Sequence, residues 1–522
     1  MKKFRFLIAL ILPLSLLAQP KNIMIGDTYN PEEPSIYINP KNPALIMAGA
    51  NISRCYLSQD TGRTWTMTTL TSNSGVWGDP CISADTAGNF LFLHLANPPQ
   101  GQGHWIDRIV FQKYNIGNQN WTTDSYMGLS TDTLKAQDKE WIAVDPGNNN
   151  MYVTWTEFDK YGSKNPLDSS RILFSRSIDG GSSWSIPIRL SRQAGDCIDS
   201  DSTVEGAVPA IGPNGEIYVA WAGPNGLVFD RSLDSGKTWL NNDIAIDPMP
   251  GGWDYDVAGI SRCNGLPITK CDVSNGPNHG TIYVNWTDQR NGLQNVDVWL
   301  SKSTDGGNTW SSPVRVNDDT TQRVQFFTWM DVDQSTGYLY FVFYDRRNHN
   351  DSLTDVYMAV SKDGGSTFAN YQISESPFLP SHTIFFGDYN NISVQNGIIR
   401  PIWTRLHNGQ LSIWTALINP DTHLGISKDR NGQEDIISST YPNPTNGENY
   451  FSFKIHQATK INLEVIDNQG RIICKLIDGE IFQAGMFVKA FNSADYNLSS
   501  GTYYFVLESY NHRITKKFVL NR

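Results

Sequence analysis

The chain has 522 residues, of which 12% are aromatic, with 43 glycines, 26 prolines and a formal net charge of −11. This acidic balance argues against a nucleic-acid partner, which would need a basic surface. The composition favours many short strands joined by turns, and the length allows one large all-β domain followed by a small one.

The first 19 residues are predicted to be a secretory signal peptide. A basic start precedes an apolar run at 6–17, and the small residue Ala18 stands before the polar Gln19. No later segment approaches the roughly 20 apolar residues of a membrane span. We therefore expect an exported protein without a membrane span.

One motif, Ser-x-Asp-x-Gly-x-Ser/Thr-Trp, recurs through most of the chain. Its copies begin at Ser58, Ser177, Ser232, Ser303 and Ser361, the last with Phe in place of Trp. The Asp carboxylate can accept backbone N–H groups of its own turn and Gly can adopt a positive φ, so each copy predicts a tight hairpin with its aromatic packed beneath the next strand. The motif resembles the Asp box of the sialidase-like β-propellers. In that family the boxes are structural and lie on the face opposite the active site.

A second recurring hairpin, made of an inner strand, a turn and an apolar strand, lies upstream of each box. The spacing between the first two boxes is about twice the others, so one repeat lacks a box, and its hairpin is visible at 107–121. The seven upstream hairpins are at 34–49, 79–95, 140–156, 205–222, 259–287, 328–344 and 387–404. With an outer pair of strands each, they predict an all-β, seven-bladed propeller over 20–425. We expect residues 22–26 to supply the last strand of the seventh blade and so remove the open sheet edges.

The composition changes after about residue 425. A polar linker, 426–439, leads to Tyr-Pro-Asn-Pro at 441–444, an Asn-Gln-Gly-Arg turn at 468–471, a Gly-Thr-Tyr-Tyr strand at 501–504 and a basic tail. These features resemble the C-terminal sorting domain of the type IX secretion system of Bacteroidetes. The resemblance implies a small β-sandwich at 440–522, an interaction with the type IX secretion machinery, and a secreted or cell-surface protein. A small carbohydrate-binding β-sandwich is the alternative interpretation.

The six cysteines are too few to build a disulfide scaffold. Cys263 and Cys271 are close in sequence, and His279 follows eight residues later. In an exported protein a local Cys263–Cys271 disulfide is the favoured interpretation, and a structural zinc site using both thiolates and His279 is the alternative. The Asp-rich turn at 317–319 could also bind calcium, although a solvated turn is favoured there. No cofactor is required for the chemistry considered below.

The functional face is expected where the inner strands begin and where the second strands end, because these segments surround the central opening. The inner-strand starts hold Asp79, residues 138–140, Glu205, Arg262, Trp329 and Asp388. The arginines that could converge there are Arg171, Arg262, Arg290, Arg346, Arg347 and Arg405. Guanidinium groups suit a carboxylate or sulfate ester. We therefore expect an acidic polysaccharide as partner, with Arg262, Arg290, Arg346 and Arg405 as substrate-binding residues.

His94 occupies the position where the equivalent strands carry Trp155, Trp221, Trp286 and Phe343. Seven-bladed propellers of this kind resemble an ulvan lyase family in which a His and a Tyr transfer protons and an Arg neutralises the uronate carboxylate. By this resemblance His94, Tyr161 and Arg171 would be catalytic in a β-elimination. A packing role remains the alternative for His94 and for Tyr161.

Two other functions remain open. An exo-sialidase would carry an Arg in a Phe/Tyr-Arg-Ile/Leu-Pro motif and six blades, whereas this chain has Glu-Pro-Ser-Ile at 33–36 and seven hairpins. A non-catalytic glycan-binding propeller would need only the basic and aromatic mouth. A monomer is expected in each case.

Overall fold

A computed structural model describes residues 20–407, 409–418, 436–441, 444–455, 458–468, 470–483, 485–509 and 513–521. The predicted signal peptide at 1–19 and most of the predicted linker lie outside these residues. The chain divides into two compact units, Met1–Leu424 and Gly425–Arg522.

The described part of the first unit contains seven antiparallel sheets in chain order, each forming one blade. The first three comprise β2 (Ser35–Ile38), β3 (Ile46–Ala50), β4 (Arg54–Ser58) and β5 (Thr66–Thr69); β6 (Gly78–Ala84), β7 (Phe90–Leu95), β8 (Ile109–Asn115), β9 (Asn120–Trp121) and β10 (Ser125–Met127); and β11 (Ala136–Val144), β12 (Met151–Phe158), β13 (Ser170–Ser177) and β14 (Ile188–Arg189). The next three comprise β15 (Glu205–Ile211), β16 (Ile217–Gly223), β17 (Gly226–Ser232) and β18 (Ile244–Asp247); β19 (Ile268–Cys271), β20 (Ile282–Asp288), β21 (Asp297–Ser303) and β22 (Val314–Arg315); and β23 (Gln325–Asp333), β24 (Tyr338–Asp345), β25 (Asp355–Ser361) and β26 (Ala369–Gln372). The seventh comprises β27 (Asn391–Gln395), β28 (Ile398–His407), β29 (Gln410–Leu417) and β1 (Lys21–Gly26).

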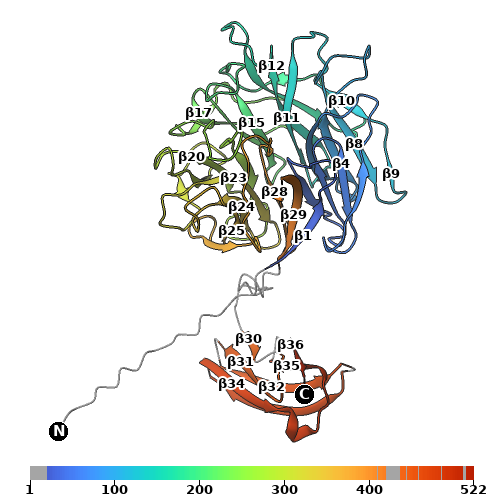
Figure 1. Ribbon diagram of the computed structural model, residues 1–522, viewed down its shortest axis with the longest axis vertical. Coiled ribbons are helices and arrows are strands. Elements are labelled where there is room, and N and C mark those ends of the chain that lie inside the picture. The colour runs from blue at the N-terminus through green and yellow to red at the C-terminus, as the bar shows by residue number, and fades with distance from the viewer. Residues whose placement is uncertain are drawn as a thin grey trace, which may run out of the picture. The chain divides into compact units, whose positions relative to one another are not determined.

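The blades form a closed ring. Each inner strand contacts the inner strand of the next blade, and β27 contacts β2. The N-terminal strand β1 pairs antiparallel with β29, from Lys21 opposite Leu417 to Gly26 opposite Ile413. Figure 1 shows β1, in blue, beside β29, in orange. The predicted seven-bladed propeller and its closure by the N-terminal strand are both confirmed.

The Asp boxes join the third and fourth strands of their blades, as the box of blade 4 illustrates. Ser232 Oγ accepts the Gly236 N–H at 2.8 Å, and Asp234 accepts the backbone N–H and the hydroxyl of Thr238 at 2.8 and 2.7 Å. Hydrogen bonds from Thr238 and Ser232 lower the pKa of Asp234 to about 2. The carboxylate is therefore used to hold its own turn.

The box aromatics pack differently from the expectation. Three of them contact a ring of the preceding blade, with centroid distances of 5.3 Å for Trp184–Phe111, 4.9 Å for Trp239–Phe174 and 5.1 Å for Trp310–Phe229. The box aromatic of blade 6, Phe368, contacts Phe341 of its own blade. The sequence motif predicts the turn, but it does not predict which blade the aromatic side chain contacts. The boxes therefore seal the seams between adjacent blades.

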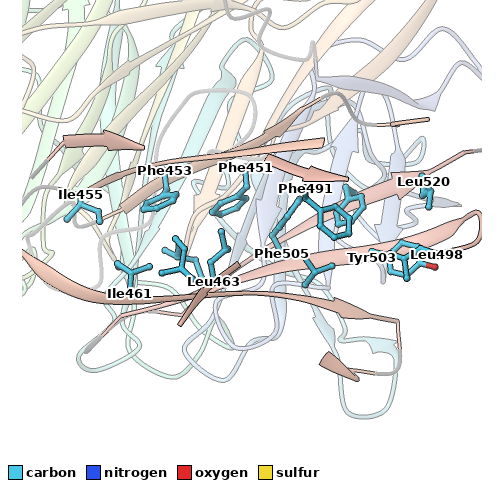
Figure 2. Packing of buried hydrophobic residues seen from close by; sticks show 14 residues of the cluster. Phe451, Phe453, Ile455, Ile461, Leu463, Phe491, Leu498, Tyr503, Phe505 and Leu520 are labelled. Carbon is cyan, nitrogen blue, oxygen red and sulfur yellow. The ribbon is translucent and has the colours of Figure 1, made fainter. Parts of the chain in front are cut away.

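The described residues of the second unit form two sheets. They comprise β30 (Ile436–Tyr441), β31 (Glu448–Ile455) and β34 (Gly485–Asn492), and β33 (Ile472–Phe482), β32 (Thr459–Asp467), β35 (Gly501–Glu508) and β36 (Arg513–Leu520), with a 3-10 helix at Ser493–Tyr496. Figure 2 shows Phe451 and Phe453 of one sheet facing Leu463 and Phe505 of the other. Alternate residues of β32 are buried, as expected for a strand with one core face. The strand β30 begins at Ile436, within the last residues of the predicted linker.

Candidate active site at the propeller mouth

A repeated backbone irregularity places charged side chains at the mouth of the central opening. The inner strands β6, β11, β15 and β23 each carry a one-residue bulge at the corresponding point near their start. The bulged residues Asp79, Lys139, Gly206 and Phe327 all have a positive φ, as does Glu33 just before β2. Bulges re-aim side chains and are common beside active sites. Here they direct Glu33, Asp79 and Lys139 into a shared cavity of about 190 Å³.

Asp388 is the centre of an ion-pair network in this cavity. Arg262 Nε lies 2.9 Å from Asp388 Oδ1 and Arg262 Nη2 contacts Oδ2, while Lys139 Nζ lies 2.6 Å from Oδ2. The Asp388 side chain is only 1% exposed. Burial opposes its ionisation, but Lys139 and Arg262 outweigh this effect and lower the pKa of Asp388 to about 2. Both cations of the mouth are therefore already matched by a carboxylate.

Tyr161 and Asp199 form a hydrogen-bonded pair beside this network. Tyr161 lies in the loop between β12 and β13, and its hydroxyl donates to Asp199 Oδ2. Arg262 Nη1 lies 3.3 Å from the same carboxylate oxygen and 3.4 Å from the Tyr161 hydroxyl. Burial and the charge of Asp199 raise the pKa of Tyr161. The phenol therefore stays protonated and acts as a donor that stabilises the Asp199 carboxylate.

Several other carboxyl groups of the mouth hold their protons more tightly than usual. Burial, together with the charges of Asp79 and Asp199, outweighs Lys139 and raises the pKa of Asp138 to about 8. Burial also raises the pKa values of Glu33, Glu140 and Glu205. At neutral pH the mouth thus contains protonated carboxyls beside ionised ones, an arrangement typical of acid–base sites.

Aromatic residues surround the opening and close its floor. The exposed rings of Trp77 and Trp105 meet edge to face at 5.4 Å, and Phe385, also exposed, lies 5.2 Å from the Arg262 guanidinium. Below the charged layer, Trp141 packs on Trp329 at a centroid distance of 4.4 Å. The opening is therefore a cup with an apolar rim, a charged wall and an aromatic floor.

The structure separates the three residues expected to be catalytic. Tyr161 reaches the cup, but His94 is fully buried, with Nδ1 2.9 Å from Leu95 O, and burial lowers its pKa to about 4. Arg171 is bound by Glu157 and Asp159, with Nη1 2.6 Å from Glu157 Oε1. The expectation that His94 lies at the rim is wrong, because its ring occupies the core space that tryptophans fill in other blades.

Of the expected substrate-binding arginines, only Arg262 lines the cup. Arg290 is bound by Asp247 and Asp288, Arg346 is buried with Nε on Thr354, and Arg405 donates to Ser376 and to the Pro377 carbonyl. Arg347 is likewise held by Asp345 and Asp318. These arginines bind acceptors near the ends of strands, so they do not form the expected basic mouth.

The cysteines are all free, so the predicted Cys263–Cys271 disulfide is not formed. Cys263 lies before β19, where its carbonyl accepts the Tyr255 N–H, and Cys271 is the last residue of that strand. Four strand residues span about 10 Å, beyond the reach of a disulfide. His279 Nδ1 contacts Ser274 O at 2.5 Å.

Among the described residues, no group of three or more His, Cys, Asp or Glu side chains could hold a metal ion. The zinc and calcium hypotheses therefore lack a ligand cluster in this part of the chain. At the Asp-rich turn, Asn317 Nδ2 donates to Asp297 and Asp319 at 2.6 and 2.7 Å, which accounts for its polar side chains.

Several mouth residues escaped the sequence analysis. Asp79, Asp138, Glu205 and Asp388 were expected at inner-strand starts, but Glu33, Asp199, Trp77, Trp105 and Phe385 were not singled out. The Asp-Cys-Ile-Asp-Ser-Asp run that includes Asp199, directly before an inner strand, was the available signal. The rim aromatics lie in loops that carry no repeat pattern.

Comparison with known proteins agrees with both units. Residues 439–521 match the family model described as "Secretion system C-terminal sorting domain". The chain carries a type IX sorting domain. It is therefore exported to the cell surface or beyond. Across the described residues, no helix is long and apolar enough to cross a membrane.

The propeller is similar to several solved structures. An ulvan lyase bound to -[GlcA(1-4)Rha3S]- aligns with 12% identity and a TM-score of 0.45, covering 75% of this chain and 95% of that one. A Trypanosoma rangeli sialidase in complex with sialic acid aligns with 11% identity and a TM-score of 0.40, covering 87% and 84%. A Penicillium chrysogenum α-L-arabinanase complexed with arabinobiose aligns with 13% identity and a TM-score of 0.39, covering 69% and 99%. No curated protein matches the sequence. At these identities the likeness concerns the fold alone.

Proposed function

We propose that the mouth binds and hydrolyses a neutral glycan. The observation that carries the proposal is the presence, in adjoining parts of one cup, of a carboxyl that stays protonated at neutral pH, Asp138, and a carboxylate held by a phenol and a guanidinium, Asp199. Glycoside hydrolysis uses such a pair, since one group must donate a proton while the other must be ionised.

In this mechanism Asp138 protonates the glycosidic oxygen as the bond to the leaving sugar breaks. Asp199 acts on the anomeric carbon from the other side of the ring, either directly or by taking a proton from an attacking water. Tyr161 and Arg262 stabilise the Asp199 carboxylate and orient it. Lys139 and Asp388 fix the wall of the cup behind them.

The charge balance favours an uncharged substrate. Arg262 and Lys139 both bind Asp388, so neither offers an unmatched cation to a uronate or sialate carboxylate. The exposed Trp77 and Trp105 rings suit the apolar faces of sugar rings, which need no charge. A uronate lyase is less well supported, because His94 is sealed in the core and Arg171 is bound by two carboxylates. The raised pKa of Asp138 favours an enzyme over a binding module.

The test is an activity screen of the full exported chain against neutral polysaccharides, followed by reducing-end release. Uronate polysaccharides and sialosides are assayed in parallel, since a lyase would produce an unsaturated uronate that absorbs in the near ultraviolet. Asp138→Asn and Asp199→Asn should each lower kcat by about 10²-fold to 10⁴-fold. Asp256→Asn is the matched control, because Asp256 is exposed and forms no hydrogen bond with other described residues. Unsaturated products, sialic acid release, or full activity of both site variants would contradict the proposal.

A further inference from the structure

The seams between blades follow a positional rule. In three seams, the residue three positions before a box serine is covered by the box of the next blade. A Cβ added to Gly236 would lie 2.5 Å from Phe174, one added to Gly307 would lie 2.2 Å from Phe229, and one added to Gly365 would lie 2.5 Å from Leu300. These seams are therefore filled by a large side chain below and a box above.

The seam between blades 1 and 2 lacks both the large side chain and the covering box. Cys55 stands three positions before Ser58, where the other blades with a box have Phe, Leu or Met, and blade 2 carries no box to cover it. The space that the larger side chain and a box tryptophan would occupy is left as a groove of about 660 Å³. Its lining residues are Met47, Cys55, Leu57, Gln59, Thr64, Thr66, Thr68, Thr69, Tyr114, Gln119 and Trp121. This volume falls within the usual range for ligand sites, about 300–1,000 Å³.

The chemistry of the groove indicates its ligand. None of its lining side chains is charged, although charged residues make up 18% of the chain. Tyr114 and Trp121 form an aromatic pair with centroids 5.2 Å apart. The Gln59 and Gln119 amides, the Trp121 indole N–H and the Thr66 hydroxyl form no hydrogen bond with other described residues. The hydroxyls of Thr64, Thr68 and Thr69 bond to Asp60, the Cys55 carbonyl and Arg54. Uncharged donors and acceptors beside aromatic rings match a neutral sugar, which presents hydroxyls and apolar ring faces.

We propose that this groove is a second carbohydrate-binding site, which takes a neutral oligosaccharide segment. It is separate from the mouth, since the two share no lining residue. It extends the proposed function to substrate capture: a polymer bound in the groove stays on the protein while the mouth acts on a chain end or branch. The groove depends on the loss of one box and one large side chain, and not on the mouth chemistry.

The test is affinity electrophoresis of the full exported chain through gels containing arabinan, galactan or β-glucan, with carboxymethylated β-glucan as the charged comparison. Cys55→Phe fills the groove and Trp121→Ala removes an aromatic wall. Each should weaken retention about threefold to tenfold, as expected for one aromatic contact. Thr66→Arg, at an exposed strand position, obstructs the groove without altering the core and gives the same result if either core variant fails to fold. Hydrolysis of a short soluble oligosaccharide should be unchanged in all three.

The mouth variant Trp105→Ala distinguishes the two sites. If wild-type retention is lost only in Trp105→Ala, or if no neutral polysaccharide retards the wild-type chain, the groove proposal is overturned while the mouth proposal is judged by its own assay. If retention depends on Cys55 and Trp121 in a protein that hydrolyses nothing, the groove proposal holds and the mouth proposal fails.

Discussion

Arg262 and Asp388, which precede the inner strands of blades 5 and 7, are joined across the mouth by two parallel hydrogen bonds. One buried carboxylate thus connects blade 5, blade 7 and, through Lys139, blade 3. This network fixes the wall of the cup before any ligand arrives, so its loss should affect both stability and activity.

We expect Arg262→Met to destabilise the propeller by about 1–3 kcal/mol, because Asp388 keeps only Lys139 as a partner. The value lies below that of a fully buried pair, since the Arg262 side chain is 39% exposed. Denaturant unfolding measures the change. The double variant Arg262→Met/Asp388→Asn should lose less than the sum of the two single losses. Strict additivity would show that the pair is not coupled.

The raised pKa of Asp138 predicts a pH dependence with a definite sign. Its pKa is about 8 in the folded protein, above the ordinary value for Asp, so Asp138 is a proton donor below about pH 8 and loses that role above it. We expect kcat/KM, which reports groups of the free protein, to fall as pH rises through about 8. We also expect the stability contributed by the bound proton to be lost between about pH 4 and 8. Asp138→Asn should retain more activity on aryl glycosides, whose leaving groups need no protonation, than on natural linkages. Equal losses on both substrates would exclude Asp138 as the general acid.

The buried His94 predicts an acid-labile component of stability. Burial lowers its pKa to about 4, whereas the unfolded chain takes up the proton near pH 6.5. Stability is therefore lost as pH falls from about 6.5 towards 4. His94→Phe, which restores the aromatic of the equivalent strands, should narrow the difference between the free energies of unfolding near neutral pH and at about pH 5. The activity of this variant at neutral pH should be unchanged. Loss of activity in a folded variant would show that His94 takes part in catalysis.

Asn22 fastens the closing strand to the neighbouring blade. Its Nδ2 lies 2.8 Å from Ile373 O, and its Oδ1 accepts the Glu375 N–H at 2.9 Å. Asn22→Ala should cost about 1–3 kcal/mol, because the buried Ile373 carbonyl and the part-buried Glu375 N–H lose their partners. Thermal unfolding measures the loss, with the exposed Lys21→Ala as the control. Equal midpoints for the two variants would contradict this fastening role.

The sequence predicts the architecture well because the propeller repeats itself. The residues that form each box turn lie within eight consecutive positions, so the motif can be recognised in the sequence. The upstream hairpins have similar strand sequences. The number of blades and the order of strands in each blade therefore follow from the spacing of these repeats. Closure by β1 could also be anticipated, since the chain offers the seventh blade a third strand at 410–417 but no fourth one before residue 425.

The site was less accessible to sequence reasoning. Arginine positions near loop ends suggested a basic mouth, but these guanidinium groups bind carboxylates of their own hairpins. Arg171 binds Glu157, its partner on the adjacent strand, and Arg290 binds Asp288, two residues before it. His94 differs from the aromatic residues at the equivalent positions of other blades, and this difference suggested a functional role. Because the position lies on a buried strand face, the substitution alters the packing of the core and not the surface of the mouth. The Tyr161–Asp199 contact joins two loops that come together only when the propeller ring is folded, so the sequence pattern does not predict it.

The pairing of β1 with β29 has a consequence for the order of events during export. The first strand of the propeller to be synthesised is the last to find its partner, since β29 lies at the other end of the ring. Until that partner emerges, β1 cannot contribute to a stable blade, and its closing contact is among the most distant in sequence that the chain makes, which slows folding. The chain therefore has a built-in delay that keeps the ring open while its ends are far apart.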